Sequence, residues 1–376
     1  MNLKENILLN NSKNNIFKSE MKLYKKYIIA CTKFKKYNNN KKINNKNPYL
    51  SIILPTYNMK KYIERALLSI LNQSFQDFEI IIVNDFSNDN IGEIIQKYKK
   101  IESKVKVIEH NQNFGTYISR VDGVLNSKGQ YIIFIDPDDS FLNPCLFQKI
   151  YEFNSKYYLD IIEFIVFYEE EGKNKIIIPD DHKLNHFHNF KQKIIYQSNL
   201  SNLLFFEPRN ENISGIICRT IWNKVIKKRI LLKTINFIGK DNCTNQYFNM
   251  AEDTIMNIIN FQFANNYSNI NIPGYLYNKR KKSISHNYAS SYNILTSKNI
   301  LLYFKLLYKY IKYFNKDRNI LYNELRELNY FLIRFKKFND TQSINNTKIY
   351  LNILLKEKHI SMEFKKLIEN LALFLN

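Results

Sequence analysis

The chain has 376 residues, a formal charge of +22 and four cysteines. This length allows one large domain with an extension, or two domains. No stretch approaches the roughly 20 apolar residues that a membrane-spanning helix needs, and the N-terminus lacks the apolar segment of a signal peptide. The cysteines have no CxxC spacing, which argues against a structural zinc site and a disulfide framework and favours a reducing compartment. We therefore expect a cytoplasmic protein.

The positive charge suggests a nucleic-acid or anionic-membrane partner, but the composition weakens this suggestion. Asn, Lys, Ile, Tyr and Phe are abundant, and their AT-rich codons can account for much of the charge. Lys outnumbers Arg heavily, although Arg is the preferred residue for bidentate recognition of bases and phosphates. A basic nucleic-acid-binding protein is the rival prediction, and no recognised motif supports it. We expect no nucleic-acid partner.

Residues 1–47 are rich in Asn and Lys and contain neither Gly nor Pro. This composition predicts a basic, flexible tail. The alternative is a short basic helix over Met21–Tyr37 that contacts an anionic membrane surface. In that case the protein would be peripheral at the cytoplasmic face of a membrane.

Ordered pattern begins at Pro48, and apolar runs alternate with segments of helical spacing. The predicted strands are Leu50–Leu54, Phe78–Val83, Val105–Ile108 and Tyr131–Ile135, and the predicted helices are Lys60–Leu71, Gly92–Ile101 and Gly115–Asn126. We expect Pro55 to stop the first strand. The alternation predicts an α/β fold with a mainly parallel sheet and helices on both faces. Neither GxGxxG nor a P-loop occurs.

Three acids, Asp136, Asp138 and Asp139, follow the apolar run Tyr131–Ile135 directly. In open α/β sheets, ligands bind outside the carboxyl ends of the strands. Mg²⁺ is commonly held by one or two carboxylates together with substrate phosphates. The pattern therefore predicts a site for a divalent cation, Mn²⁺ or Mg²⁺, and a diphosphate. The alternative is a turn capped by acids.

The second half of the chain has weaker patterns. They predict helices at Asn143–Phe153, Phe190–Phe206 and Ala251–Phe263, and strands at Ile161–Phe167 and Tyr275–Tyr277, followed by a basic loop at Lys279–Ser283. From Tyr288 onward the chain is expected to be wholly helical. We interpret this region as a packed helical extension, and the alternative is a surface that docks an acceptor or a membrane.

Several motifs occur in a fixed order. They are SIILPTYN at 51–58, EIIIVNDFSNDN at 79–90, NFG at 113–115, GQYIIFIDPDD at 129–139, WNK at 222–224, AED at 251–253 and YNKR at 277–280. This series resembles inverting glycosyltransferases of the GT-A fold, family-2 type, and it covers about two-thirds of the chain. The resemblance implies a GT-A (Rossmann-like) domain over residues 48–286, preceded by the tail 1–47 and followed by a helical C-terminal extension over 287–376.

The resemblance also implies a role for individual residues. Asp253 corresponds to the catalytic base, and Asp138 and Asp136 to the metal ligands, with Asp136 alternatively on the ribose. The implied nucleotide-sugar contacts are Pro55, Tyr57, Asp85, Arg120, Asp136 and Arg280. From the residues alone, Asp85 could be a turn residue, Tyr57 a core residue, Arg120 a helix-surface charge or an internal ion pair, and Arg280 part of a solvated loop.

The implied reaction is metal-dependent transfer of a sugar, with inversion, from a nucleotide-diphosphate sugar to an acceptor hydroxyl. We expect a UDP-sugar as donor and a glycan or a lipid-linked molecule as acceptor. The sequence departs from the family pattern at Asn84 and Phe86, which replace an acid and a glycine, and at Asp122, which replaces an asparagine. These departures bear on the identity of the donor more than on the reaction class. The alternative function is a catalytically inactive nucleotide-sugar-binding or glycan-binding module of the same fold.

Overall fold

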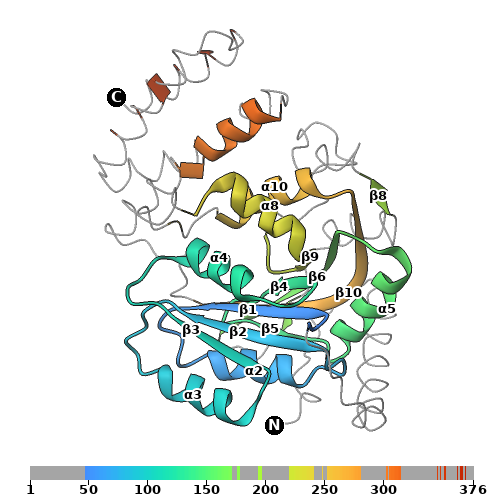
Figure 1. Cartoon of the computed structure of the whole chain (residues 1–376). Helices are drawn as coiled ribbons and strands as arrows, with labels where there is room; N and C mark the ends of the chain where they lie inside the picture. Colours follow the sequence, from blue (N-terminus) through green and yellow to red (C-terminus); the bar gives the residue numbers. More distant parts are fainter. Residues whose placement is uncertain are drawn as a thin grey trace.

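The computed structural model describes residues 47–171, 176–177, 194–196, 220–240, 248, 252–280, 302–303 and 305–314, with isolated positions after 344. Its centre is a mixed sheet with the strand order β3-β2-β1-β4-β9-β6-β10-β5 (Figure 1). The strands in this order are β3 (Val105–Glu109), β2 (Phe78–Asn84), β1 (Leu50–Thr56), β4 (Tyr131–Phe134), β9 (Lys224–Lys227), β6 (Ile161–Glu170), β10 (Asn266–Lys279) and β5 (Ser140–Phe141). The first four are parallel, and β9 is antiparallel to both β4 and β6.

Helices cover both faces of the sheet because its strands alternate apolar side chains between two cores. On β1, Ile53 belongs to one core and Ile52 and Leu54 belong to the other. One face carries α2 (Ile63–Leu71), α3 (Gly92–Ile101) and α5 (Leu146–Tyr157), and the other carries α4 (Thr116–Asn126), α8 (Lys228–Ile238) and α10 (Glu252–Phe263). The expected α/β fold with helices on both faces is confirmed.

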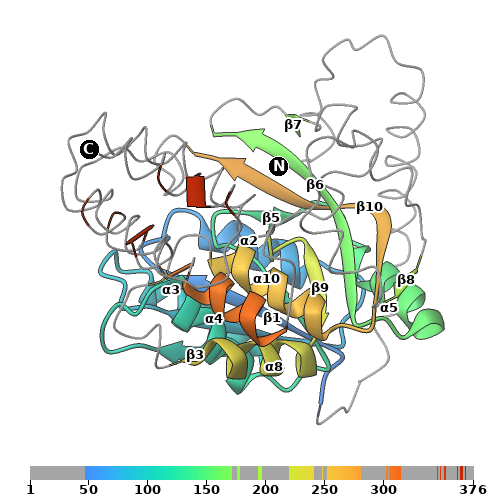
Figure 2. The same ribbon diagram turned by 90° about the horizontal axis from the view of Figure 1, so that it is seen from above.

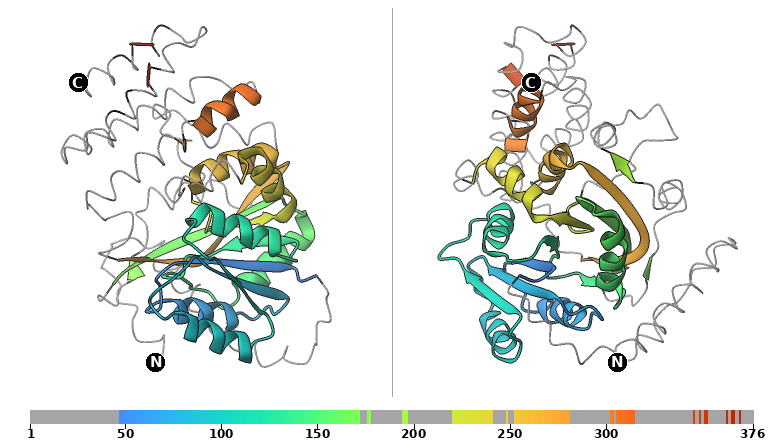
Figure 3. Two further views of the ribbon diagram at one scale, coloured as in Figure 1. Left: turned by 60° about the vertical axis from the view of Figure 1, so that its left-hand side comes forward. Right: turned by 45° about the vertical axis from the view of Figure 1, so that its right-hand side comes forward.

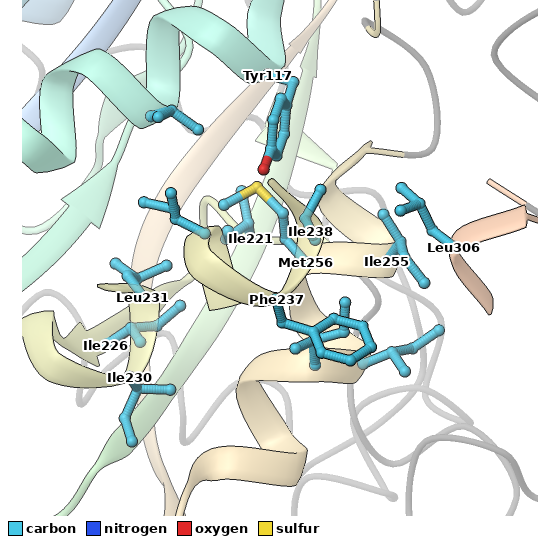
Figure 4. Close-up of a cluster of buried hydrophobic side chains, with 14 of the residues drawn as sticks. Tyr117, Ile221, Ile226, Ile230, Leu231, Phe237, Ile238, Ile255, Met256 and Leu306 are labelled. Atoms are coloured by element: carbon cyan, nitrogen blue, oxygen red, sulfur yellow. The ribbon is translucent and has the colours of Figure 1, made fainter. Parts of the chain in front are cut away.

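The core on the α4 face extends beyond the sheet. Figure 4 shows Tyr117 of α4, Phe237 and Ile238 of α8, and Met256 of α10 together in this cluster. Leu306 joins them from the helical segment within residues 305–314, which lies beside α8 and α10 in both views of Figure 3. This packing fixes the start of α10 relative to α4.

In the first half of the chain, the predicted elements match the observed ones closely, except at Pro55. The strand continues through Pro55 to Thr56, so the predicted stop is wrong. Ile53 accepts a hydrogen bond from the amide of Ile135, which places its backbone groups on the β4 side. By the two-residue strand repeat, the nitrogen of Pro55 lies on the same side. The pairing with β4 ends at Ile53, so Pro55 removes no hydrogen bond from the sheet.

The second half contains larger differences. The predicted three-residue strand at Tyr275–Tyr277 is part of the 14-residue β10, which runs beside β6 (Figure 2). Pro273 and Gly274 lie inside β10 at shifts of register, which explains why its length was missed. Residues 195–196, inside the predicted helix Phe190–Phe206, form the strand β8 (Ile195–Tyr196) against β10. A second short strand, β7 (Ile176–Ile177), pairs with β6.

Some expectations fall on positions for which the structure supports no description. The tail, apart from residue 47, and most of the region after 287 lie outside the described residues. Among the described residues, no helix has the length and apolar character needed to cross a bilayer. Cys145, the one cysteine within the described ranges, is disulfide-bonded. The cysteine spacing did not reveal this bond, so it no longer supports a reducing compartment.

A buried ion pair joins the three strands β6, β9 and β10. Lys224 and Glu163 have fully buried side chains, with Nζ 3.6 Å from Oε1. Lys224 donates to the carbonyl of Thr220 at 2.7 Å, and Tyr267 donates its hydroxyl proton to Glu163 at 2.6 Å. Burying two charges is costly unless each keeps its partners, and removal of one partner leaves the other charge without compensation.

We predict that Lys224→Met lowers the free energy of unfolding by about 3–5 kcal/mol, because Glu163 remains buried without its cation. Denaturant unfolding measures this change. Lys227→Met is the matched control: Lys227 is partly exposed, 3.3 Å from Asp160, which keeps two contacts with Arg229. The control should change stability by less than about 1 kcal/mol. Equal effects of the two substitutions would contradict the assignment of Lys224.

Candidate active site at the carboxyl ends of the strands

The strand order changes direction between β1 and β4. The chain passes from β1 to β2 and β3 on one side, and β4 then returns to the other side of β1. Such a switch point is where open α/β sheets bind ligands, outside the carboxyl ends of the strands. Tyr57, Asp85 and Asp136 follow β1, β2 and β4 at this edge. Three of the predicted site residues are therefore at neighbouring strand ends.

The carboxylates of the acidic turn after β4 differ in their contacts. Asp139 accepts hydrogen bonds from the Tyr275 hydroxyl at 2.7 Å and the Asn278 amide at 2.8 Å, and it is buried. Burial, and then the charges of Asp138 and Asp136, raise the pKa of Asp139 well above its usual value. Asp139 therefore fastens the turn to β10. Asp136 and Asp138 are left to face the site.

Asp138 is paired with Arg280 at the end of β10. The guanidinium Nε and Nη2 atoms each lie 2.5 Å from Asp138 Oδ2, and the group lies over the ring of Tyr62 at 4.8 Å. Burial and the charge of Asp136 raise the pKa of Asp138, and Arg280 offsets them only in part. This turn therefore has an excess of negative charge.

The donor set at this turn fits a divalent cation that shares its coordination with a ligand. Among the described residues, no group of three or more His, Cys, Asp and Glu side chains could hold a metal ion. Asp136 and Asp138 supply two hard oxygen donors, and Mg²⁺ is usually bound by one or two carboxylates with substrate phosphates completing the shell. Arg280 presently neutralises one of these carboxylates.

Arg120 of α4 is buried and connects acids from two distant parts of the chain. Its Nη1 donates to Glu252 Oε1 at 2.7 Å, and its Nη2 lies 3.4 Å from Asp136 Oδ1. The guanidinium also lies 5.9 Å from the centre of the Phe134 ring. Of the roles considered for Arg120, the internal ion pair is the one observed. Contact with a nucleotide stays a prediction.

Asp253 begins α10 directly after Glu252. Its Oδ1 accepts the amide hydrogen of Thr254 at 2.8 Å. Burial raises the pKa of Asp253, the positive charge of Arg120 opposes the rise, and the charge of Asp136 adds to it. Burial also raises the pKa of Glu252 to about 7, again opposed by Arg120. The acids at the start of α10 and at the end of β4 therefore share one electrostatic environment around Arg120.

Asp85 is held by the loop that precedes α4. Its Oδ1 accepts from the Phe114 amide, and its Oδ2 accepts from the Gly115 amide, each at 2.8 Å. Gly115 has a φ of 87°, a conformation that a glycine adopts without strain. His110 Nδ1 lies 2.8 Å from Asp85 Oδ1. A carboxylate has about four acceptor positions, so these three contacts leave one position of Asp85, whose side chain is buried.

His110 lies between two carboxylates and was not identified from the sequence. Its Nε2 lies 3.2 Å from Asp122 Oδ2, and Asp122 also pairs with Lys240 at 2.5 Å. Burial alone would lower the pKa of His110, but Asp122 and Asp85 outweigh this effect and raise the pKa to about 9. No short motif marks these paired charges, because the residues come from α4 and from the segments that follow β2, β3 and α8. These contacts explain why an acid stands at position 122, where the family pattern has an asparagine.

The other predicted contacts differ in exposure. Pro55 is buried within β1 opposite Val83, so it shapes the strand end from inside. Tyr57 is 43% exposed and Phe86 is 57% exposed, so Tyr57 is not a core residue. Asn84 donates to Glu109 Oε2 at 2.7 Å. An acid at position 84 would meet the like charge of Glu109, which explains this departure from the family pattern.

The fold and the acids at its switch point define an α/β domain of the GT-A type. A sequence model of glycosyl transferase family 2 matches residues 51–213. This part of the chain is therefore a glycosyl transferase family 2 domain.

Three comparisons extend this assignment. An uncharacterised glycosyltransferase of Bacillus subtilis, EpsJ, is 36% identical over 138 residues, or 37% of this chain and 39% of EpsJ. The cholesterol galactosyltransferase of Borreliella burgdorferi is 27% identical over 77% of this chain and 75% of its own. The Staphylococcus aureus TarS fragment 1–349, solved with UDP-GlcNAc, superposes with a TM-score of 0.51 and 21% identity over 80% of both chains. The chain therefore spans only 39% of the length of EpsJ. The similarity to the TarS fragment establishes the fold.

We predict that His110 makes stability depend on pH. Its pKa is higher in the folded state, so its contribution is fully present below about pH 6.5, the unfolded value, and is lost as the pH rises through about 9. Wild type should lose up to roughly 3 kcal/mol of unfolding free energy over this range relative to His110→Gln. Denaturant unfolding at several pH values measures the difference. Parallel pH profiles for the two proteins would show that His110 is not protonated in the fold.

Proposed function

We propose that this protein transfers a sugar from a nucleotide-diphosphate donor to an acceptor hydroxyl, with inversion at the sugar, in glycan synthesis. The observation that carries the proposal is the cluster around Arg120, which joins Asp136 from the end of β4 with Glu252 at the start of α10. Inverting transfer needs a diphosphate site on one side of the sugar and a proton acceptor on the other. Asp136 and Asp138 provide the first, and Asp253 provides the second.

The donor nucleotide in this proposal lies along the carboxyl ends of β1, β2 and β4. The free acceptor position of Asp85 takes a hydrogen bond from the base, and the exposed ring of Tyr57 packs against it. We propose a UDP-sugar, because the TarS fragment was solved with UDP-GlcNAc on the same fold. A glycan or a lipid-linked molecule is the proposed acceptor, and the name of the Borreliella relative, which specifies cholesterol, supports a lipid.

Asp136 and Asp138 would hold Mn²⁺ or Mg²⁺ together with the donor diphosphate. A bound divalent cation stabilises the negative charge that develops on the leaving diphosphate. Arg280 lies on Asp138 without a ligand and would be released toward the diphosphate once another cation neutralises this carboxylate. Arg280 therefore serves as a phosphate contact, in line with its position beside Tyr62.

Asp253 is the proposed general base. Its pKa is raised by burial, which improves a carboxylate as a proton acceptor, because the best catalytic pKa lies near the working pH. The proton of the acceptor hydroxyl passes to Asp253 as the oxygen attacks the anomeric carbon. Glu252 is engaged with Arg120 and positions the start of the helix instead.

The location of the reaction is part of the proposal. A lipid-linked acceptor would require contact with a membrane surface at the cytoplasmic face. Membrane contact is the alternative interpretation of Met21–Tyr37 and of the region after 287. The first segment and most of the second lie outside the described residues. Co-sedimentation of the full chain with anionic vesicles tests this part separately from the chemistry.

We predict that Asp138→Asn removes the Mn²⁺-dependent part of UDP binding and leaves the fold intact. The neutral amide oxygen can still accept from Arg280, but it binds a divalent cation more weakly than a carboxylate does. Calorimetric titration of UDP with Mn²⁺ and with EDTA measures this part directly. Wild type should bind UDP more tightly with Mn²⁺, and the variant should bind equally in both buffers. A metal-dependent gain of the same size in the variant would exclude Asp138 as a ligand.

We predict that Asp253→Asn slows transfer by about 100- to 10,000-fold, the usual contribution of a positioned general base. Binding of UDP and Mn²⁺ should stay at the wild-type level, because Asp253 does not contact the donor diphosphate. Product formation from a radiolabelled donor measures transfer, and calorimetry measures binding. Loss of binding together with turnover would make Asp253 a structural residue. A wild-type rate would transfer the base role to Glu252, and absence of turnover in wild type with every donor would favour an inactive binding module.

A further inference from the structure

Phe86 combines an unusual backbone with an exposed side chain. Its φ is 64°, in the left-handed region, and its ring is 57% exposed. For a bulky residue without branching at Cβ, this region still costs free energy, because Cβ approaches the following carbonyl oxygen. More than half of the ring stays in water, so burial of its apolar area contributes little to offset this cost. The folded chain therefore bears backbone strain at Phe86 that packing of its ring does not offset.

Hydrogen bonds on both sides of Phe86 hold this backbone in place. Asn84 Oδ1 accepts from the Ser87 amide at 3.2 Å, which closes the turn after β2. Ser87 Oγ accepts from the Asn58 amide at 3.0 Å, and Asn58 Oδ1 accepts from the Asn88 amide at 2.9 Å. Strained conformations persist where the surroundings determine them in this way, and they gather at functional sites. The loops after β1 and β2 thus form one fixed unit.

This unit presents two exposed aromatic residues beside a buried carboxylate. Tyr57 follows β1 and Phe86 follows β2, and the two strands are paired in register up to Thr56 and Asn84. Asp85 lies between Asn84 and Phe86 with its oxygens fixed by backbone amides. A ligand with a flat aromatic face and a hydrogen-bond donor on its edge matches these features, and a nucleobase has both.

We propose that Phe86 is a specificity-determining residue whose ring packs on the nucleobase of the donor, on the opposite side from Tyr57. This inference rests on the proposed function, because it requires that a nucleotide binds at this edge. It assigns the base-dependent part of donor affinity to a residue that the family pattern fills with glycine. The diphosphate contributes separately to donor affinity, through the acidic turn and Arg280. This part of the affinity does not depend on Phe86.

The test compares Phe86→Gly with Phe86→Tyr by calorimetric titration of UDP and of pyrophosphate, each with Mn²⁺. Stacking of a base on an aromatic side chain corresponds to about a 5- to 150-fold change in affinity. Phe86→Gly should weaken UDP binding by about this factor and leave pyrophosphate binding unchanged. Phe86→Tyr keeps an aromatic ring and should bind UDP as tightly as wild type. Thermal unfolding should place Phe86→Gly at or above wild type, because glycine relieves the left-handed strain.

Tyr158 provides a matched control. It also has a positive φ, 50°, and it is 73% exposed, at the end of α5. The neighbouring Leu159 accepts from Tyr131, at the start of β4 and so at the opposite edge of the sheet. Tyr158→Gly should change stability in the same direction as Phe86→Gly and leave UDP binding unchanged.

The outcomes separate the two proposals. If wild type binds neither UDP nor pyrophosphate, the proposed function fails before Phe86 is tested. If wild type binds UDP and Phe86→Gly binds it equally well, the assignment of Phe86 is overturned while the function stands. An equal loss of UDP and pyrophosphate affinity in Phe86→Gly would also overturn it, because the ring would then support the loop and not the base. A loss of UDP affinity in Tyr158→Gly would also overturn the assignment, because relief of backbone strain would then explain the loss of affinity in Phe86→Gly.

Discussion

A buried guanidinium holds the two halves of this site together. Arg120 lies on α4, and its partners Asp136 and Glu252 belong to the end of β4 and the start of α10. The contact of Arg120 with Glu252 spans 132 residues of chain. A buried charge is tolerated only when its partners and hydrogen bonds are kept. The position of Asp253, directly after Glu252, is therefore set by the need to compensate Arg120.

The electrostatics of the site follow from an excess of acids over bases. Asp136, Asp138, Glu252 and Asp253 gather near Arg120 and Arg280, and burial raises the pKa of Asp138, Glu252 and Asp253. A diphosphate would add further negative charge at the same place. An additional cation is the simplest way to make such a site bind an anion, which is the physical reason for the proposed Mn²⁺ or Mg²⁺. The acid in the family motif that looks most like a third ligand, Asp139, instead fastens the turn to β10.

The sequence predicts some parts of this structure better than others, for physical reasons. The strands β1, β2 and β4 are buried on both faces, so they appear as continuous apolar runs, and the acids at their ends can be located directly. β10 was underestimated because Pro273 and Gly274 usually end strands, and here they occupy shifts of register. His110 could not be found from spacing, because its two carboxylates approach it only in the folded chain. The role of Arg120 could not be decided for the same reason, because a basic residue on a predicted helix can equally well lie on the protein surface.

The departures from the family pattern gain meaning from what each side chain contacts. Asn84 pairs with Glu109, and Asp122 pairs with Lys240 and lies beside His110. Both side chains therefore have an internal partner in the fold. Phe86 differs, because its ring is directed to solvent at a backbone position that suits glycine. A residue that costs the fold stability at a strand end is best explained by what binds there, whereas Asn84 and Asp122 are explained by the fold itself.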